Sequence, residues 1–182
     1  MPGDNVPGLD ELEIEIEVLV ALAQHGVEYA VATLGTATTP VHVQKLFRQV
    51  DEVVFCFDGD AAGRKAAWHA LEVALPVLSD SKTVKFLFLP AEDDPDTFIR
   101  AHGRDAFEQM VVDSRPLSEF LLSELGRRVD LDTLEGRSRL IAEAKPLVSR
   151  VAAPALQLQL IKALAGLAGV TPDEAMRLSG IA

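Results

Sequence analysis

The stretch Glu52-Val53-Val54-Phe55-Cys56-Phe57-Asp58-Gly59-Asp60 decides the fold, because in it an apolar strand runs straight into two carboxylates. Its β-branched and aromatic residues are typical of a strand that is covered on both faces. Asp58 and Asp60 stand two residues apart, so in an extended chain their side chains point to the same side. Gly59 between them lets the backbone turn sharply. We therefore expect a buried strand that ends in an acidic site.

Strands and helices alternate on both sides of this stretch. We predict strands over residues 12–18, 29–34, 52–57 and 83–89, and helices over residues 18–25, 40–49, 61–78 and 97–102. This alternation predicts a sheet of mainly parallel strands with helices on both faces, the α/β class. Beyond residue 105 we expect no further strands, only helices over residues 106–112, 116–128, 134–151, 155–166 and from Pro172 onward. The predicted organisation is an α/β domain over residues 1–112 and a small all-α bundle over residues 113–182.

A second acidic group, Asp93, Asp94 and Asp96, follows the strand predicted over residues 83–89. Sites in parallel sheets form outside the carboxyl ends of the strands, so neighbouring strands would bring both groups together. Carboxylates that crowd in this way repel each other unless a cation lies between them. Hard oxygen ligands suit Mg²⁺ or Mn²⁺. Asp-Gly-Asp and Asp-Pro-Asp are also common turns and helix caps, and the residues alone leave both interpretations open.

Composition limits the classes of function. The 182 residues are 48% hydrophobic, enough for a sizeable core, and the net charge is −11. Such a balance argues against a broad surface that grips nucleic acid, which needs clustered Lys and Arg. The single cysteine, Cys56, excludes an internal disulfide and a zinc cluster, and inside a strand we expect it to be an apolar residue rather than a nucleophile. No signal peptide or membrane span is expected, and the predicted location is the cytoplasm.

Several motifs resemble, in order and spacing, the Toprim domain of bacterial DNA primase. They are residues 21–26 (ALAQHG), 32–37 (ATLGTA), 54–66 (VFCFDGDAAGRKA) and 86–90 (FLFLP) with Asp94-Pro95-Asp96. Residues 115–120 (RPLSEF) look like the start of the helical subdomain of the primase polymerase core. The resemblance covers roughly residues 19–180.

This resemblance implies a Toprim-like sheet of the Rossmann type and Mg²⁺-dependent (or Mn²⁺-dependent) synthesis of short RNA primers on single-stranded DNA during replication. It implies that the metal ligands are Asp58, Asp60, Asp94 and Asp96. It also places residues 33–37, with Thr36, beside the metal. Arg64 and Lys65 would lie close by on the following helix, where they could meet phosphates or nucleic acid; otherwise they form an ordinary solvated helix face.

The chain departs from the family in its first predicted strand. The family strand ends in Glu-Gly-Tyr-Met-Asp, whose Glu is the acid/base residue, but the corresponding positions hold Ile14 and Val18. Glu13 or Glu15, one residue away, are the candidate catalytic substitutes, although a one-residue slip reverses the face of every strand side chain. The other interpretation is that this segment is foreign to the family. We predict that the isolated chain binds Mg²⁺ or Mn²⁺ weakly and makes primers poorly or not at all.

The resemblance also implies domains that this sequence does not contain. A whole bacterial primase carries a zinc-binding domain, a basic subdomain before the Toprim fold and a C-terminal helicase-binding domain. We therefore expect no zinc and no membrane partner. Single-stranded DNA template and nucleoside triphosphates are expected as partners through the full primase, and the replicative helicase only through the missing C-terminal domain.

Two other functions compete with the primase interpretation. A Toprim nuclease would use the same acidic site to cut phosphodiesters. An interaction module would instead use the Leu-rich helical half, for example Leu156, Leu158 and Leu164, although these leucines equally fit a plain bundle core.

Overall fold

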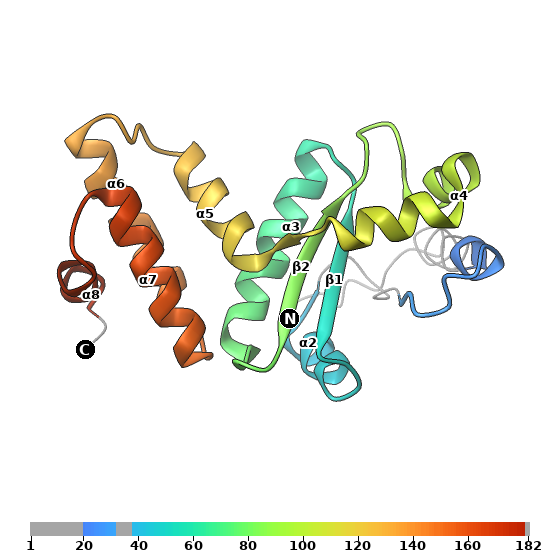
Figure 1. The fold of residues 1–182 in the computed structure, drawn as a ribbon, viewed down its shortest axis with the longest axis horizontal. Coiled ribbons are helices and arrows are strands. Elements are labelled where there is room, and N and C mark those ends of the chain that lie inside the picture. The colour runs from blue at the N-terminus through green and yellow to red at the C-terminus, as the bar shows by residue number, and fades with distance from the viewer. Residues whose placement is uncertain (1–19, 32–37, 181–182) are drawn as a thin grey trace, which may run out of the picture.

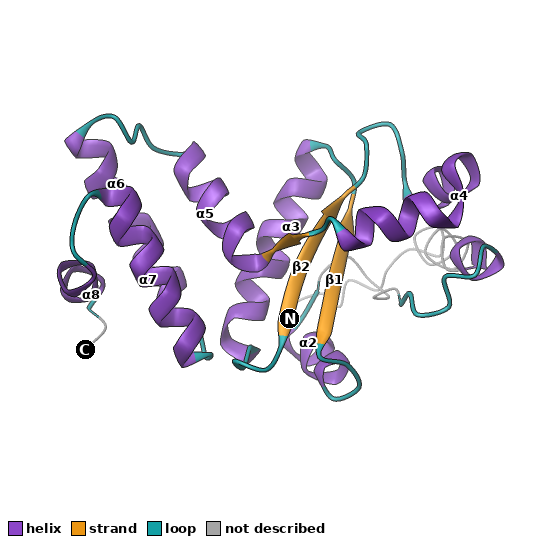
Figure 2. Ribbon diagram, viewed as in Figure 1, coloured by secondary structure: helices purple, strands orange, loops and turns teal. Residues whose placement is uncertain are grey.

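The computed structural model describes residues 20–31 and 38–180 (Figure 1). Strands β1 (Glu52–Phe57) and β2 (Thr83–Phe88) lie side by side and run parallel, with Phe55 opposite Phe86. A short strand, β3 (Arg115–Pro116), pairs antiparallel with β2, so the described sheet has the order β1-β2-β3 (Figure 2). The strand predicted over residues 12–18 lies outside the described residues.

Seven α-helices make up most of the remaining described chain. They are α2 (Pro40–Phe47), α3 (Ala61–Ala74), α4 (Pro95–Val112), α5 (Leu117–Arg127), α6 (Leu134–Val148), α7 (Pro154–Ala168) and α8 (Pro172–Ser179). Five of them begin where an N-cap side chain accepts a hydrogen bond from the first turn, at Thr39, Asp60, Asp94, Thr133 and Thr171. Such caps satisfy backbone N–H groups that have no partner within the helix, which explains where these helices start.

Most of the predicted elements are confirmed, including the strands at β1 and β2 and the helix that Thr39 and Pro40 begin. The helices predicted on either side of Gly103 form one element, α4, which Gly103 breaks with φ 80° and ψ 175°. The helix predicted over residues 61–78 ends earlier, at Ala74, and Pro76 stands in the 3₁₀ turn Leu75–Val77 that follows α3.

Two predictions about strands differ from the described structure. Of the strand predicted over residues 29–34, residues 32–34 lie outside the described residues, and residues 29–31 form a turn and an irregular segment in which Tyr29 and Val31 are exposed. Strand propensity takes effect only where neighbouring strands and packing support it, and of these three residues only Ala30 packs against the smaller apolar cluster. Conversely, β3 forms beyond residue 105, where no strand was expected. Two residues give no alternation to recognise, and Pro116 is tolerated there because β3 is an edge strand.

The two faces of the sheet are covered by different helices, as predicted for the α/β class. Phe55, Phe57, Phe86 and Phe88 belong to the larger core, which includes α3 and α5. The ring of Phe120 in α5 lies 4.8 Å from that of Phe86. On the opposite face, Val54, Cys56, Leu87 and Leu89 pack in a smaller cluster with residues of α4 and of the helical segment at residues 20–24.

Helices α6, α7 and α8 stand beyond α5, away from the sheet (Figure 1). Their buried residues belong to the same continuous core as the sheet face that α5 covers. The predicted boundary after residue 112 therefore precedes β3 and α5, both of which pack on the sheet. In the described part of the chain, no helix is long and apolar enough to cross a membrane.

Candidate metal centre

Three carboxylates gather where β1 and β2 end. Asp58 follows the last residue of β1, Asp60 is the N-cap of α3, and Asp94 is the N-cap of α4 after β2. The backbone N–H of Gly63 donates to Asp60 Oδ1 at 2.7 Å, and that of Thr97 donates to Asp94 Oδ1 at 2.8 Å. Because β1 and β2 are parallel, both caps lie at the same edge of the sheet.

The pKa of Asp58 reflects its surroundings. Burial raises the pKa of Asp58 above its usual range, and the charges of Asp60 and Asp94 raise it further. Asp60 and Asp94 are thus each close enough to Asp58 to repel its ionised carboxylate. A cation between them would relieve that repulsion and favour the ionised form of Asp58.

The arrangement is open rather than a closed cage. Within residues 20–31 and 38–180, no three His, Cys, Asp or Glu side chains converge tightly enough to enclose an ion. Mg²⁺ suits such a site, because it keeps several waters and usually binds through one or two carboxylates together with substrate phosphates. The capping bonds of Asp60 and Asp94 use Oδ1, so the second oxygen of each carboxylate is still available as a ligand.

Asp96 does not join this group. Its Oδ1 accepts a hydrogen bond from Arg100 Nε at 2.6 Å, one turn further along α4. The charges that raise the pKa of Asp58 come from Asp60 and Asp94, not from Asp96. Asp60 and Asp94 thus lie near Asp58, whereas Asp96, the fourth predicted ligand, pairs with an arginine.

Two glycines let the backbone close around Asp58. A Cβ on Gly59 would overlap the carbonyl oxygen of Leu89, and a Cβ on Gly63 would overlap the carbonyl oxygen of Asp58. Gly59 was expected to be a turn residue, whereas no role was predicted for Gly63. The signal was available, since glycine is a poor helix former and Gly63 stands in the first turn of a helix.

The side chain of Arg64 reaches toward α5. Its guanidinium lies 3.3 Å from Glu124 Oε1 and 5.3 Å from the centre of the Phe88 ring. Arg127 approaches the same Glu124 oxygen at 3.2 Å. Two guanidinium groups therefore share one carboxylate, which leaves a local excess of positive charge.

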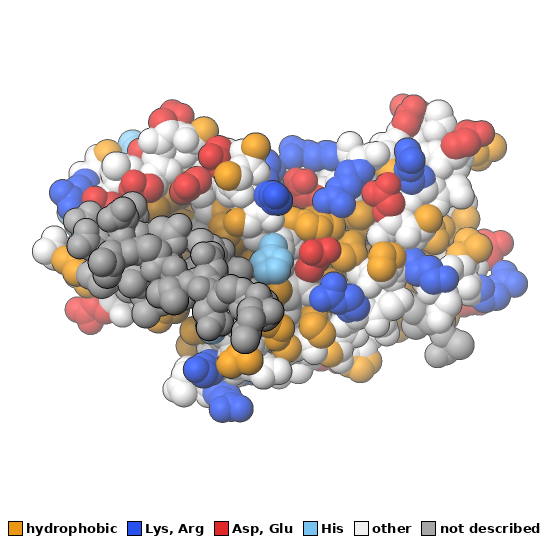
Figure 3. Space-filling view, turned by 180° about the vertical axis from the view of Figure 1, so that it is seen from behind, with side chains coloured by type: hydrophobic (Ala, Val, Ile, Leu, Met, Phe, Trp, Pro, Cys, Tyr) orange, Lys and Arg blue, Asp and Glu red, His pale blue; other side chains and the backbone are white. Residues whose placement is uncertain are grey.

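Further cations extend this excess. Arg128 lies over the ring of Trp68 at 4.0 Å, and Lys65 is exposed on α3. We call this group the basic cluster; it comprises Arg64, Lys65, Arg127 and Arg128. In the rear view, several Lys and Arg side chains lie in the upper middle of the molecule, interspersed with Asp and Glu side chains (Figure 3). The basic cluster starts in the first turns of α3, directly after the acidic edge of the sheet.

The remaining predicted residues have different outcomes. Glu13, Glu15 and Thr36 lie outside the described residues. Cys56 is half-buried in β1, and burial together with the charge of Asp58 raises the pKa of its thiol to about 12. A thiol with such a pKa is protonated at neutral pH, which agrees with the prediction that Cys56 is not a nucleophile.

Two family models match the chain. Residues 17–89 match the Toprim domain, and residues 118–173 match the DnaB-helicase binding domain of primase. The second match corrects the expectation that a helicase-binding segment is missing from this chain. Residues 118–173 fall mainly on α5, α6 and α7, whose apolar periodicity is that of any bundle core and does not by itself indicate a helicase-binding segment.

The chain is also similar to whole proteins and solved structures. A DNA primase from Neisseria meningitidis (serogroup A, strain DSM 15465 / Z2491) is 52% identical over 163 residues, which are 89% of this chain and 28% of that primase. The crystal structure of a DNA primase domain from Pseudomonas aeruginosa superposes with a TM-score of 0.86 at 44% identity, covering 90% of this chain and 51% of that one.

A structure of the DnaG primase catalytic domain bound to ssDNA gives a TM-score of 0.83 at 47% identity, covering 87% of this chain and 50% of that chain. The chain spans a little over a quarter of the length of the curated relatives that it matches.

Proposed function

Because the chain belongs to the bacterial DNA primases and corresponds to the Toprim and adjoining helical part of their catalytic core, we propose that it supplies the metal centre for RNA primer synthesis on single-stranded DNA. The observation that carries this proposal is the meeting of Asp58, Asp60 and Asp94 at the carboxyl edge of the parallel strands. Asp96, paired with Arg100, is the outlying member of the proposed ligand set.

Mg²⁺ or Mn²⁺ bound at these carboxylates would neutralise charge on a nucleoside triphosphate during phosphoryl transfer. Backbone groups of the chain would keep these carboxylates in position around the ion. Gly63 and Thr97 N–H groups fix the orientation of the Asp60 and Asp94 carboxylates. The first turns of α3 and α4 point toward the same edge, and helix N-termini favour phosphate groups.

The basic cluster supports contact with a nucleic-acid strand. A chain with a net charge of −11 repels DNA, so a strand that approaches the acidic edge needs local cations. Arg64 and Lys65 of this cluster stand in the first turns of α3, four and five residues after Asp60. We assign them to phosphate contact with the template or the primer, and we assign the acid/base role to Glu13 or Glu15.

The test is a chimera in which the matching 163 residues of the Neisseria primase are replaced by those of this chain. We expect the chimera to elongate primers on single-stranded DNA, and Asp58→Asn to reduce the rate by about two orders of magnitude. Asp105→Asn, an exposed carboxylate elsewhere on α4, is the control. Equal rates for Asp58→Asn and the control would refute the proposal. Cleavage of labelled DNA with Mn²⁺, without elongation, would instead indicate a nuclease.

We also propose that the helical part docks on a DnaB-type helicase, because residues 118–173 match the corresponding family model. The chain, immobilised by one end, should bind the purified helicase of the organism that encodes it in an interferometry assay. Absence of binding at micromolar helicase would contradict this second proposal and leave the first one standing.

A further inference from the structure

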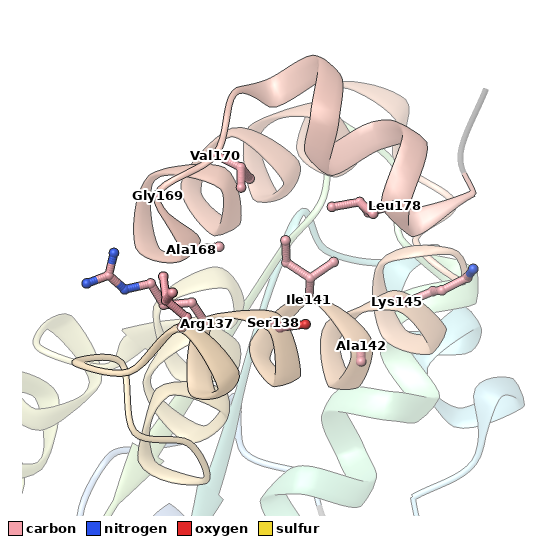
Figure 4. A pocket seen from close by; sticks show the side chains of 10 residues that line it. Arg137, Ser138, Ile141, Ala142, Lys145, Ala168, Gly169, Val170 and Leu178 are labelled. Atoms are coloured by element: carbon pink, nitrogen blue, oxygen red, sulfur yellow. The ribbon is translucent and has the colours of Figure 1, made fainter.

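An open groove lies between α6 and α8, inside the helical part. Its volume is about 570 Å³, and it is lined by Ile141 of α6 and, on the opposite side, by Val170 after α7 (Figure 4). Leu134 and Leu178 also line it, and 77% and 56% of their surfaces are exposed. We call it the α6–α8 groove. Large apolar side chains that gather at the rim of a hollow are typical of a surface that another protein covers.

The charge of the α6–α8 groove is opposite to that of the chain. Arg137 and Lys145 lie at its two ends, and no acidic residue is among the described side chains that line it. Arg137 Nε donates to the carbonyl oxygen of Leu131 at 2.8 Å, which fixes the guanidinium at the rim. In a chain with a net charge of −11, this groove therefore attracts a partner that carries carboxylates.

We infer that the α6–α8 groove binds an amphipathic segment of the DnaB-type helicase, with large apolar side chains in the groove and carboxylates facing Arg137 and Lys145. The inference rests on the helicase docking proposed above, and it specifies which surface of the chain the helicase contacts. Nearly all the residues that line the groove fall within residues 118–173, the segment that matches the helicase-binding model. A shallow apolar channel with charged ends fits the recognition of an amphipathic helix.

The helical part provides a matched control for this assignment. Leu158 and Leu167 of α7 are also exposed, at 41% and 40%, and also lie within residues 118–173, but they do not line the α6–α8 groove. Lys162 of α7 is likewise an exposed cation away from the groove. Substitutions at these positions change the same residue types on the same helical part without touching the proposed contact.

The experiment measures the affinity of the 182-residue chain and its variants for the purified helicase. The double variant Leu134→Gln/Leu178→Gln should bind about tenfold more weakly or worse, because buried apolar anchors dominate such interfaces. Lys145→Glu should also weaken binding, and its effect should shrink in high salt because the charges are then screened. Leu158→Gln/Leu167→Gln and Lys162→Glu should bind as the unmodified chain does.

The outcomes separate the two proposals. If the unmodified chain does not bind the helicase, the docking proposal fails and the α6–α8 groove fails with it. If the unmodified chain binds but the groove variants bind equally well, only the groove assignment is overturned. A dimer in sedimentation that Leu134→Gln/Leu178→Gln dissociates would assign the groove to a second copy of the chain and also overturn it. Circular dichroism of each variant verifies that the helices are intact.

Discussion

Gly63 packs directly against the main-chain carbonyl of Asp58, so closely that no side chain fits between them. The first turn of α3 and the end of β1 are therefore held at a fixed distance. The same turn carries Asp60, whose side chain caps it. The positions of Asp58 and Asp60, two proposed metal ligands, thus depend on Gly63, which has no side chain that could bind a metal.

Gly63→Ala should displace the first turn of α3 and weaken Mn²⁺ binding. The added methyl group meets backbone rather than a flexible side chain, so we expect a loss of about 1–3 kcal/mol in stability. Electron paramagnetic resonance of free Mn²⁺ would measure the affinity, and urea denaturation the stability.

Gly166→Ala is the matched control for this change. A Cβ at Gly166 in α7 meets nothing within 4 Å, so alanine there should be neutral or stabilising by up to about 1 kcal/mol. Unchanged Mn²⁺ affinity in Gly63→Ala would show that the close packing does not position Asp58.

Asp60 serves as helix cap and proposed ligand, and two substitutions separate these roles. Asp60→Ser keeps an oxygen that can accept from the Gly63 N–H, so stability should hardly change while Mn²⁺ affinity falls. Asp60→Ala loses the cap as well and should cost a further ~1 kcal/mol. Calorimetric titration and thermal unfolding of both variants give the two quantities. If Asp60→Ser binds Mn²⁺ like the unmodified chain, Asp60 is only a cap.

Asp58 should make stability depend on pH. Its pKa is raised in the fold, so the folded chain holds this proton more tightly than the unfolded chain, and ionisation of Asp58 destabilises the fold. This destabilisation should develop as pH rises from about 4 through the raised pKa. At neutral pH without divalent cations, Asp58→Asn should therefore be more stable, by about a few tenths of a kcal/mol because exposed charges are screened.

The same variant tests the role of the cation. Mg²⁺ should raise the melting temperature of the unmodified chain and leave that of Asp58→Asn nearly unchanged. At pH 3, where Asp58 is protonated in both states, the two proteins should be equally stable. If Asp58→Asn is less stable than the unmodified chain in EDTA at neutral pH, the claim that Asp60 and Asp94 repel the Asp58 carboxylate is contradicted.

Phe120 joins the helical part to the sheet. It is 1% exposed, and its ring lies 5.4 Å from that of Phe88 and 6.5 Å from that of Trp68. Phe120→Ala should cost about 3–5 kcal/mol. Since the core is continuous, the unmodified chain should unfold in one transition by both far-ultraviolet circular dichroism and Trp68 fluorescence. Two separate transitions would show that the helical part folds independently.

The sequence predicted best where local chemistry decides the structure. The strand at β1, the helix that begins at Pro40 and the break at Gly103 all follow from side-chain or backbone preferences within a few residues. It was less successful where strand pairing decides the structure. Residues 29–31 have strand propensity but form no strand, and Arg115–Pro116 becomes a strand because it pairs with β2.

The candidate site followed the same pattern. That Asp58 and Asp94 meet could be predicted from two acidic stretches after two parallel strands. The ion pairs of Asp96 with Arg100 and of Arg64 with Glu124 could not be predicted. Each of these side chains has several possible partners of opposite charge, and only the folded structure determines which of them lies within reach.

Crystals of the chain soaked in Mn²⁺ test the central claim most directly. An anomalous difference map should show a peak bounded by the carboxylates of Asp58, Asp60 and Asp94, with Asp96 still on Arg100. The same map would reveal whether Glu13 or Glu15 lies within one water of the ion. A fully soaked crystal with Mn²⁺ peaks only elsewhere on the surface would contradict a metal centre at the end of β1.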